Sequence, residues 1–520
     1  MKNPDEKSVV VIGAGVGGLC AAVRLASAGL RVTVIEAQAG PGGKMRTMDS
    51  RAGPVDAGPT VLTMRGVFDE VFACAGTRLE DHVTLVAQPV LARHWWPDGS
   101  TLDLFADPEA SAAAIADLAG ARAADEFRQF HRLSAQLYTA FDAPMMQAAR
   151  PHLMAIAANA LRNPRLWPVL RPGVTLARHL ARQFSDPRLR QLFGRYATYV
   201  GGAPDLSPAV LSLIWAAEAQ GVWAVQGGMH GLAQALARLA QQQGASLNYN
   251  VTAGRIERQE GRVSGVKLSD GRLLKCNQVV FNGDPAALLA GLLGKGPQGA
   301  VRPQAALPRS QSAWVWAFAA QPMGVDLAYH NVFFCDDPVQ EFGPIAKGQM
   351  PDQATLYVCA QDRAAGPPPL GTVERFEIIM NAPPDTKQRA GEIAQCRQRT
   401  FPQLARFGLT FDQGPPDSSL TTPQGFATLF PGSQGALYGR SPVGMLAPFQ
   451  RPGARTALQG LYLAGGGAHP GAGVPMAALS GKHAAEAILS DLALASKSHP
   501  TAMPGGTSTG FRTTGRAQSR

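Results

Sequence analysis

The chain has 520 residues, of which 45% are apolar and 17% are charged, so it can bury a large core and form more than one domain. The 57 glycines follow no three-residue period, which excludes a collagen-like fibre, and no apolar run approaches the roughly 20 residues of a membrane-spanning helix. The six cysteines are far apart and form no CxxC pair, which disfavours a disulfide scaffold, a zinc ribbon or another metal site. Residues 1–7 are charged and the apolar run behind them is too short for a secretion signal, so we expect a cytoplasmic globular protein.

The formal net charge of +10 is unevenly distributed. Residues 496–520 contain four basic residues and no acidic ones, in a Gly-, Ser-, Thr- and Pro-rich composition that predicts a disordered tail. Residues 141–200 contain nine arginines and two aspartates, interleaved with Leu and Trp. Short helices of this composition suit the surface of an anionic bilayer, and a solvated face of a helical subdomain is the alternative. Nucleic acid is not expected as a partner, because no recognition motif accompanies the arginines.

A nucleotide-binding site is predicted near the N-terminus. Residues 9–12 have the pattern of a buried parallel strand and lead into Gly13-Ala14-Gly15-Val16-Gly17-Gly18, which satisfies GxGxxG. A helix follows, and a second apolar strand at residues 32–35 ends at Glu36-Ala37. The glycines allow a tight turn and a close approach to pyrophosphate, the helix N-terminus attracts the phosphates, and Glu36 can accept hydrogen bonds from ribose hydroxyls. This order of elements argues against a plain glycine turn but does not choose between NAD and FAD.

Two segments after Glu36 favour FAD. Residues 40–47 contain Gly43-Lys44-Met45, and residues 56–61 contain Gly58-Pro59-Thr60. A lysine beside a glycine pair can reach a phosphate while the glycines keep other side chains away from it. The first segment resembles the second FAD signature of amine-oxidase-like flavoproteins. The sequence has no second GxGxxG and no redox cysteine pair, which disfavours an enzyme reduced by NAD(P)H through a disulfide and favours oxygen or a quinone as the electron acceptor.

The C-terminal end is predicted to return to the same cofactor. A buried strand at residues 461–464 opens into a glycine-rich run that starts with Gly465-Gly466 and ends with Gly473-Val474-Pro475-Met476. A helix is expected to begin near Met476, and Pro475 suits its first turn. A helix N-terminus directed at the N1/O2 edge of a flavin would stabilise the negative charge that appears on reduction.

Together, these segments resemble the bacterial-type phytoene desaturase (carotenoid desaturase) family. The resemblance extends over residues 9–489 and includes internal signatures at residues 199–202 and 221–229 and the His469-Pro470-Gly471 run. Within that family, three segments look most like the 1-hydroxycarotenoid 3,4-desaturases, or methoxyneurosporene dehydrogenases, of purple photosynthetic bacteria: residues 62–68, 216–223 and 467–469.

The resemblance implies an FAD-dependent oxidoreductase that introduces the C3–C4 double bond into 1-hydroxycarotenoids, such as 1-hydroxyneurosporene or its methoxy derivative, with the hydride going to flavin N5. It also implies an apolar substrate taken from the bilayer, and therefore a peripheral protein on the cytoplasmic or intracytoplasmic membrane. His469 is the candidate catalytic base, because its motif lies at the expected flavin and imidazole titrates near neutrality. The alternative for His469 is a role in ordering its loop, and for His230 a structural role is favoured.

Three other functions remain open. The nearest is a desaturase or isomerase of another polyene, such as phytoene or neurosporene. A flavin amine oxidase shares the fold plan, but aromatic residues make up only 7% of this chain, whereas amine sites are usually flanked by aromatic rings. A prenyl-lipid carrier of the Rab GDP-dissociation inhibitor type would hold a lipid without redox chemistry, which the intact flavin motifs disfavour.

We therefore expect an α/β fold, with a Rossmann-like FAD-binding domain of the amine-oxidase and phytoene-desaturase type. The FAD-binding domain is expected at residues 7–76, 226–293 and 455–494, with Val251 contacting the adenine through its backbone. A substrate domain built mainly on a mixed β-sheet is expected at residues 77–110 and 294–454, and a helical, basic, membrane-facing region at residues 111–225.

Overall fold

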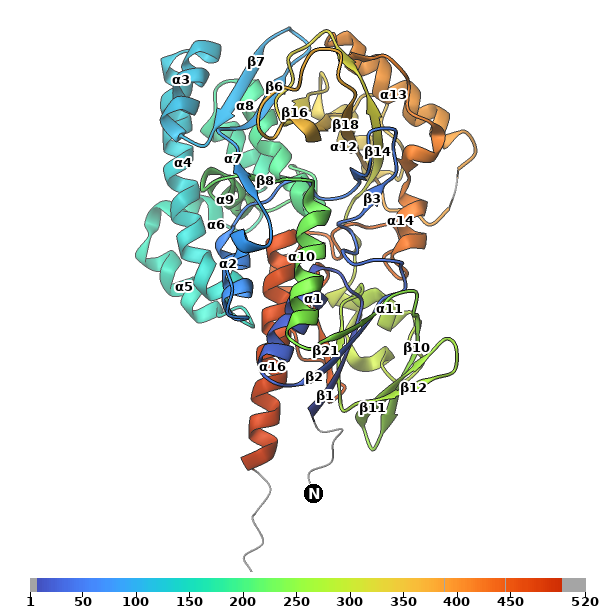
Figure 1. The fold of residues 1–520 in the computed structure, drawn as a ribbon. Helices are drawn as coiled ribbons and strands as arrows, with labels where there is room; N and C mark the ends of the chain where they lie inside the picture. The colour runs from blue at the N-terminus through green and yellow to red at the C-terminus, as the bar shows by residue number, and fades with distance from the viewer. Residues whose placement is uncertain (1–6, 388, 445, 498–520) are drawn as a thin grey trace, which may run out of the picture.

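The computed structural model describes residues 7–387, 389–444 and 446–497, and the chain folds around two sheets with a helical region beside the second (Figure 1). The first sheet is parallel throughout, with the strand order β21-β13-β1-β2-β9. Its strands are β1 (Ser8–Ile12), β2 (Arg31–Ile35), β9 (Ser246–Asn248), β13 (Gln278–Phe281) and β21 (Leu461–Leu463). All five strands lie within the three ranges that the sequence assigns to the FAD-binding domain.

Both faces of this sheet are covered, which explains why its central strand is almost wholly apolar. The helices α1 (Val16–Ser27), α10 (Met229–Gln242) and α16 (Val474–Lys497) pack on one face, and α2 (Gly66–Ala73) packs beside them. A small antiparallel sheet covers the other face and consists of β10 (Ala253–Gln259), β11 (Arg262–Leu268) and β12 (Leu273–Lys275). The short helix α11 (Pro285–Leu289) follows β13 on that side.

The predicted strands and helices of this domain are confirmed, with three corrections. The apolar run at residues 273–281 predicts one strand, but these residues form two, β12 and β13, because Cys276 and Asn277 turn the chain from the small sheet into the parallel one. The sequence analysis missed β10, because its only fully buried side chain is Ile256 and its polar residues hide the alternation. The C-terminal helix begins at Val474 rather than near Met476.

The second sheet has seven strands in the order β20-β14-β18-β17-β16-β6-β7. Only β16 and β6 run parallel, so the sheet is mixed, as predicted. Its strands are β6 (Val90–Trp95), β7 (Thr101–Phe105), β14 (Ser312–Ala320), β16 (His330–Phe333), β17 (Leu356–Ala360), β18 (Glu374–Ala382) and β20 (Leu420–Thr421). Helix α13 (Glu392–Arg406) packs on one face, and α12 (Pro338–Ala346), α14 (Pro423–Leu429) and α15 (Ala447–Gln450) lie in the connections.

The opposite face, called the inner face here, looks toward the FAD-binding domain and the helical region. The hairpin of β3 (Thr47–Met48) and β4 (Val55–Asp56) reaches it from the FAD-binding domain, where Val55 and Ala57 pack against Ala317. The remaining short strands are β15 (Pro322–Met323) and β19 (Thr410–Phe411), which pair with each other beside the main sheet.

The helical region packs against the inner face around buried aromatic side chains that include Phe127, Phe193 and Trp215. Its helices are α3 (Pro108–Ala119), α4 (Ala121–Phe141), α5 (Leu153–Arg162), α6 (Trp167–Leu170), α7 (Leu176–Gln183), α8 (Pro187–Gly194) and α9 (Leu213–Ala219). The range 111–225 was expected to be helical to its end, but it closes on a strand, β8 (Trp223–Val225), because those residues pair with β5 (Leu85–Ala87). Of the expected tail, residues 496 and 497 belong to α16, and residues 498–520 lie outside the described residues.

Within the described ranges, no helix combines the length and the apolar character needed to cross a membrane.

Candidate active site

The loops that follow β1, β2, β13 and β21 meet at one edge of the parallel sheet, the place where doubly wound folds bind nucleotides. The glycine loop there leaves no room for side chains. A Cβ at Gly18 would lie 2.2 Å from the carbonyl oxygen of Gly13, and a Cβ at Gly17 would lie 2.6 Å from the backbone nitrogen of Gly465. Gly13 itself adopts a φ of +101°, which favours glycine. The predicted fingerprint is therefore a close-packed backbone cradle at the start of α1.

Glu36 holds its carboxylate over this cradle. One carboxylate oxygen accepts a hydrogen bond from the Ala14 N–H at 2.7 Å, and the other accepts from the Gln38 N–H at 2.9 Å. The side chain is 8% exposed, so the acid is fixed where a ribose would meet the glycine loop, while its neighbour Ala37 is exposed. The backbone of Val251 lies beside it, because the Val251 N–H donates to the carbonyl of Glu36 at 2.8 Å. Contact of Val251 with an adenine stays a prediction.

The second predicted FAD segment, at residues 40–47, crosses the same glycine cradle. The Gly42 N–H donates to the carbonyl of Ala14 at 2.9 Å, and Gly43 packs against Gly15. The Lys44 ammonium donates to the carbonyl of Leu437 and lies 5.6 Å from the centre of the Phe430 ring. Burial lowers the pKa of Lys44 to about 8, and the nearby Asp284 carboxylate opposes that shift. The lysine thus contacts the substrate domain, and its binding to a phosphate stays a prediction.

The third predicted FAD segment, at residues 56–61, links the two domains at the same edge. A Cβ at Gly58 would lie 1.9 Å from the carbonyl oxygen of Lys44, so Gly58, which precedes the half-buried Pro59, packs against the backbone of Lys44 and the buried Met45. The Thr60 hydroxyl reaches the second sheet and lies 2.6 Å from the hydroxyl of Tyr357. The segment predicted to bind FAD therefore also contacts the inner face.

The C-terminal loop closes the edge from the other side. The Gly465 N–H donates to the Ser480 hydroxyl at 2.7 Å, and the Arg451 guanidinium donates to the carbonyl of Gly466 at 2.7 Å. A Cβ at Gly481 would lie 2.3 Å from the carbonyl oxygen of Gly17, so α1 and α16 cross in close backbone contact. Gly473 stands just before Val474, Pro475 and Met476, which form the first turn of α16.

Asn282 is a residue of this edge that the sequence analysis missed. Its side-chain nitrogen donates to the carbonyl of Gly13 at 3.1 Å, while its buried side-chain oxygen has no hydrogen-bond partner among the described residues. A Cβ at Gly465 would lie 2.8 Å from that oxygen, so the amide stands between the two glycine loops. The signal for Asn282 was its position as the first polar residue after a buried strand, at the carboxyl edge of the sheet.

His469 contacts the helical region and helix α16. Its Nε2 is 2.9 Å from the carbonyl oxygen of Ala148, and its ring stacks on His483 with the centres 5.8 Å apart. Burial lowers the pKa of His469. These contacts tie the C-terminal loop to the helical region, which fits the alternative role of His469 in ordering its loop. Catalysis by His469 stays a prediction. His230 is also held structurally, because its Nδ1 lies 2.8 Å from the carbonyl of Met45.

The inner face carries a row of side chains from four neighbouring strands. His330, Cys359, Glu377 and Ala317 are in register across β16, β17, β18 and β14, so they share one face. Tyr357 stands on the same face, and its hydroxyl lies 2.6 Å from His330 Nδ1 as well as from Thr60. Burial lowers the pKa of His330 to about 3, so this imidazole is neutral at physiological pH.

A second polar network joins the row from the helical region. The Arg195 guanidinium lies 5.3 Å from the centres of the Tyr357 and Tyr199 rings and donates to the Tyr199 hydroxyl at 3.2 Å. The hydroxyls of Tyr196 and Tyr199 both donate to the carboxylate of Glu218, the latter at 3.0 Å. Burial raises the pKa of Glu218. Because both tyrosine hydroxyls donate to its carboxylate, Glu218 is a weak candidate for proton transfer.

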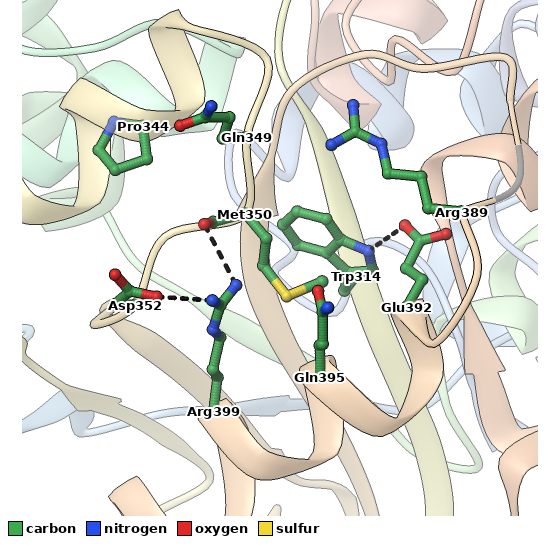
Figure 2. A pocket seen from close by; sticks show the side chains of 9 residues that line it. All are labelled: Trp314, Pro344, Gln349, Met350, Asp352, Arg389, Glu392, Gln395 and Arg399. Carbon is green, nitrogen blue, oxygen red and sulfur yellow. Dashed lines mark hydrogen bonds and ion pairs between the residues drawn. The ribbon is translucent and has the colours of Figure 1, made fainter.

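Two cavities lie outside this arrangement. The first, about 300 Å³, opens on the α13 side of the sheet, where its polar groups pair with one another: Trp314 donates to Glu392 at 2.7 Å and Arg399 to the Met350 carbonyl at 3.2 Å (Figure 2). The second, about 490 Å³, lies between the helical region and the sheet and is lined by Trp96, Phe334 and Arg195 among others. The second adjoins the inner face through Arg195, whereas the first faces away from it.

Comparison with known proteins identifies the family to which the chain belongs. Residues 16–489 match the model of the flavin-containing amine oxidoreductases, so the chain belongs to that family. Hydroxyneurosporene desaturase of Cereibacter sphaeroides is 64% identical over 94% of this chain and 99% of its own length. Hydroxyneurosporene desaturase of Rhodobacter capsulatus is 56% identical over 95% of this chain and 100% of its own length. Within the family, the chain therefore belongs to the bacterial carotenoid desaturases, which are flavin oxidoreductases acting on CH–CH groups.

Solved structures support the fold independently. An oxidoreductase from Methanosarcina mazei superimposes with a TM-score of 0.57 at 17% identity and covers 92% of this chain and 100% of its own. The cofactor of this family is FAD, and the site fits it: the glycine cradle excludes side chains, Glu36 offers an anionic acceptor, and the buried Asn282 oxygen lacks a partner. Bound FAD would supply the redox chemistry, and the glycine cradle, Glu36 and Asn282 are the parts of the chain that would hold its ribose and pyrophosphate.

Proposed function

We propose that this protein introduces the C3–C4 double bond into 1-hydroxycarotenoids, such as 1-hydroxyneurosporene or its methoxy derivative, with the hydride going to flavin N5 and oxygen or a quinone as the final acceptor. The observation that carries the proposal is the 64% identity to a hydroxyneurosporene desaturase over nearly the whole of both chains. A desaturase or isomerase of another polyene is the alternative, because a lycopene-forming phytoene desaturase of a Paracoccus species is 30% identical to this chain.

The inner face is compatible with this chemistry. Removing a hydride and a proton from adjacent carbons requires the chain of the substrate to be held against the flavin, and positioning supplies much of the acceleration. Strands β14 and β16–β18 offer a rigid sheet for that purpose, and Tyr357 contacts Thr60 of the FAD-binding loops.

We also propose that the protein takes its substrate from the cytoplasmic membrane by resting on it with α5 and α6. Helix α5 has no buried residue, and its side chains Leu153, Met154 and Leu161 are exposed, Met154 to 87%. Trp167 beside it is 50% exposed, and the exposed Arg150, Arg162 and Arg165 lie close to these residues in the sequence. Exposed Leu, Met and Trp among arginines can enter the headgroup region of an anionic bilayer.

The test of the catalytic proposal is an assay of the purified protein with FAD and liposomes that contain one carotenoid each. 1-Hydroxyneurosporene and its methoxy derivative are compared with neurosporene and phytoene, and the products are separated by chromatography and identified by their absorption spectra. Conversion of the hydroxylated and methoxylated carotenoids, each gaining one conjugated double bond, supports the proposal. Conversion of phytoene or neurosporene alone would overturn the substrate assignment.

The membrane proposal is tested by flotation with phosphatidylglycerol liposomes. The protein should float with the vesicles at low salt and dissociate as salt is added, since the arginine contribution is screened. Met154→Ser combined with Trp167→Ser should reduce flotation, whereas Val339→Ser, at a side chain exposed to 72% on α12, should leave it unchanged. Equal flotation of both variants would contradict a role for α5 and α6.

A further inference from the structure

Glu377 is a buried acid without a partner. It lies near the middle of β18, its side chain is 0% exposed, and neither carboxyl oxygen has a hydrogen-bond partner among the described residues. Buried polar groups are almost always hydrogen-bonded, because burying a carboxyl without a partner costs free energy. A position that tolerates this cost in a central strand suggests that the missing partner is a ligand.

The carboxyl of Glu377 faces the FAD-binding loops. Its register partner Ala317 packs against Val55 and Ala57, which belong to the hairpin that enters from the FAD-binding domain. The charges that act on Glu377 come from Asp56 of that hairpin and from Arg46 just before it. Glu377 also acts electrostatically on Cys359 and Tyr357 of β17 and on Tyr438. The acid therefore lies where the two domains meet, beside the Thr60–Tyr357 contact.

Arg46 shows a second unmet hydrogen bond at this junction. Its terminal nitrogen donates to the Thr421 hydroxyl and its guanidinium lies 5.7 Å from the centre of the Phe426 ring. Its Nε is buried and has no hydrogen-bond partner among the described residues. An unpartnered donor and an unpartnered acid thus approach the same junction from the two domains.

We propose that Glu377 binds the oxygen on C1 of the substrate and thereby selects carotenoids with a hydroxyl or methoxy end group; this rests on the proposed 3,4-desaturation. Only C2 separates C1 from the C3–C4 bond, so the group that binds the oxygen must stand beside the reacting carbons. Glu377 satisfies this condition, because it shares the inner face with Tyr357, whose hydroxyl contacts the FAD-binding segment.

The protonation state of Glu377 suits this role. Burial raises the pKa of Glu377 well above its ordinary value, with Asp56 raising it further and Arg46 opposing. A protonated carboxyl has one O–H donor and an acceptor oxygen. A methoxy oxygen can only accept a hydrogen bond and a hydroxyl can do both, so a carboxylic acid can bind either end group. The same protonation makes Glu377 unsuitable as the base of the reaction.

The test measures substrate preference in three variants of the full-length protein reconstituted with FAD. Glu377→Leu removes the hydrogen bond and fills the same volume, while Glu377→Gln keeps an N–H donor and removes the acid. Ser312→Ala is the matched control, since it also deletes a buried, unpartnered oxygen, on the opposite face of the neighbouring strand β14. The ratio of kcat/KM for 1-hydroxyneurosporene to that for neurosporene is measured in each, together with FAD content and the flavin absorption change on adding each carotenoid.

We expect Glu377→Leu to lower this ratio by roughly 10- to 100-fold through loss of the hydroxylated substrate, with full FAD content. Its flavin spectrum should no longer distinguish the two carotenoids, Glu377→Gln should keep part of the preference, and Ser312→Ala should keep all of it. An unchanged ratio in Glu377→Leu overturns the inference and leaves the proposed function standing. Loss of turnover on every substrate in Glu377→Gln, with FAD bound, also overturns it and identifies a catalytic acid or base. A wild-type protein that converts neurosporene but not its hydroxylated form overturns the proposed function itself.

Discussion

The two halves of the site differ in whether their buried polar groups are hydrogen-bonded. At the edge of the parallel sheet, glycine backbone packs against glycine backbone, and Glu36 is fully engaged by the N–H groups of Ala14 and Gln38. On the inner face of the second sheet, Glu377 and one nitrogen of His330 are buried without a hydrogen-bond partner in the described part of the chain. The contacts predicted to bind the nucleotide therefore also hold the fold together, whereas the unpartnered groups of the inner face destabilise the fold. At the first region, a substitution that weakens cofactor binding should also lower stability. At the second, a substitution that weakens substrate binding should raise stability.

The largest effect is expected at the glycine cradle. In Gly18→Val, the new Cβ would have to occupy a place 2.2 Å from the carbonyl oxygen of Gly13, and the backbone cannot move far inside a packed sheet edge. We expect a loss of about 3 kcal/mol or more in stability together with the loss of bound FAD. Thermal unfolding and flavin absorbance per chain measure both. Gly40→Ala is the control, because a Cβ there meets nothing within 4 Å; equal damage in the two variants would contradict the packing argument.

Glu36→Ala separates ribose binding from the packing of the cradle. The substitution removes the acceptor of the Ala14 N–H and leaves the glycines in place. Since hydrogen bonds to a charged group contribute about 1.5–3 kcal/mol, FAD should bind roughly 10- to 100-fold more weakly. Titration of the apoprotein with FAD measures the change. Unaltered affinity would show that Glu36 is a structural cap of the loop and not a ligand of the ribose.

Removal of the acid from the inner face should act in the opposite direction. Glu377→Leu replaces a buried, unpartnered carboxyl by an apolar side chain of similar size, so the free energy of unfolding should rise by about 1–3 kcal/mol. Denaturant unfolding of the wild type, Glu377→Leu and Ser312→Ala measures this. A less stable Glu377→Leu protein would mean that the carboxyl has a partner and that the two regions are not opposed.

The same acid gives the wild type a pH dependence that Glu377→Gln lacks. The folded pKa of Glu377 lies well above the ordinary value of 4.5, so between these two pH values the folded chain keeps a proton that the unfolded chain releases. The stability that proton binding by Glu377 contributes is therefore fully present below about pH 4.5 and is lost as the pH rises through the folded pKa. The stability of the wild type relative to Glu377→Gln should fall over that range, and a constant difference would contradict the raised pKa.

The two regions also differ in how far the sequence predicts them. The nucleotide edge follows from contiguous residues: the strand, the glycines of residues 13–18 and Glu36 specify a local backbone geometry, and the structure has that geometry. Asn282 escaped prediction because its role depends on the meeting of two loops that are far apart in the sequence. The row of His330, Cys359 and Glu377 is defined only by the register of three strands from distant segments. A burial pattern in one strand gives no sign of the neighbours that its side chains will have.

The smallest effect is expected where the two regions touch. Tyr357→Phe removes the hydroxyl that stands between Thr60 and His330 but keeps the ring beneath Arg195. The loss of this link leaves two buried groups without a partner, so stability should fall by about 1–2 kcal/mol while FAD stays bound. Because Thr60 belongs to the FAD-binding loops and His330 to the inner face, the hydroxyl is the direct path by which one region positions the other. Turnover of the hydroxylated carotenoid should therefore decrease more than FAD affinity, and Thr60→Val should reproduce that pattern. If FAD affinity decreased as much as turnover in both variants, the contact would belong to the nucleotide site alone.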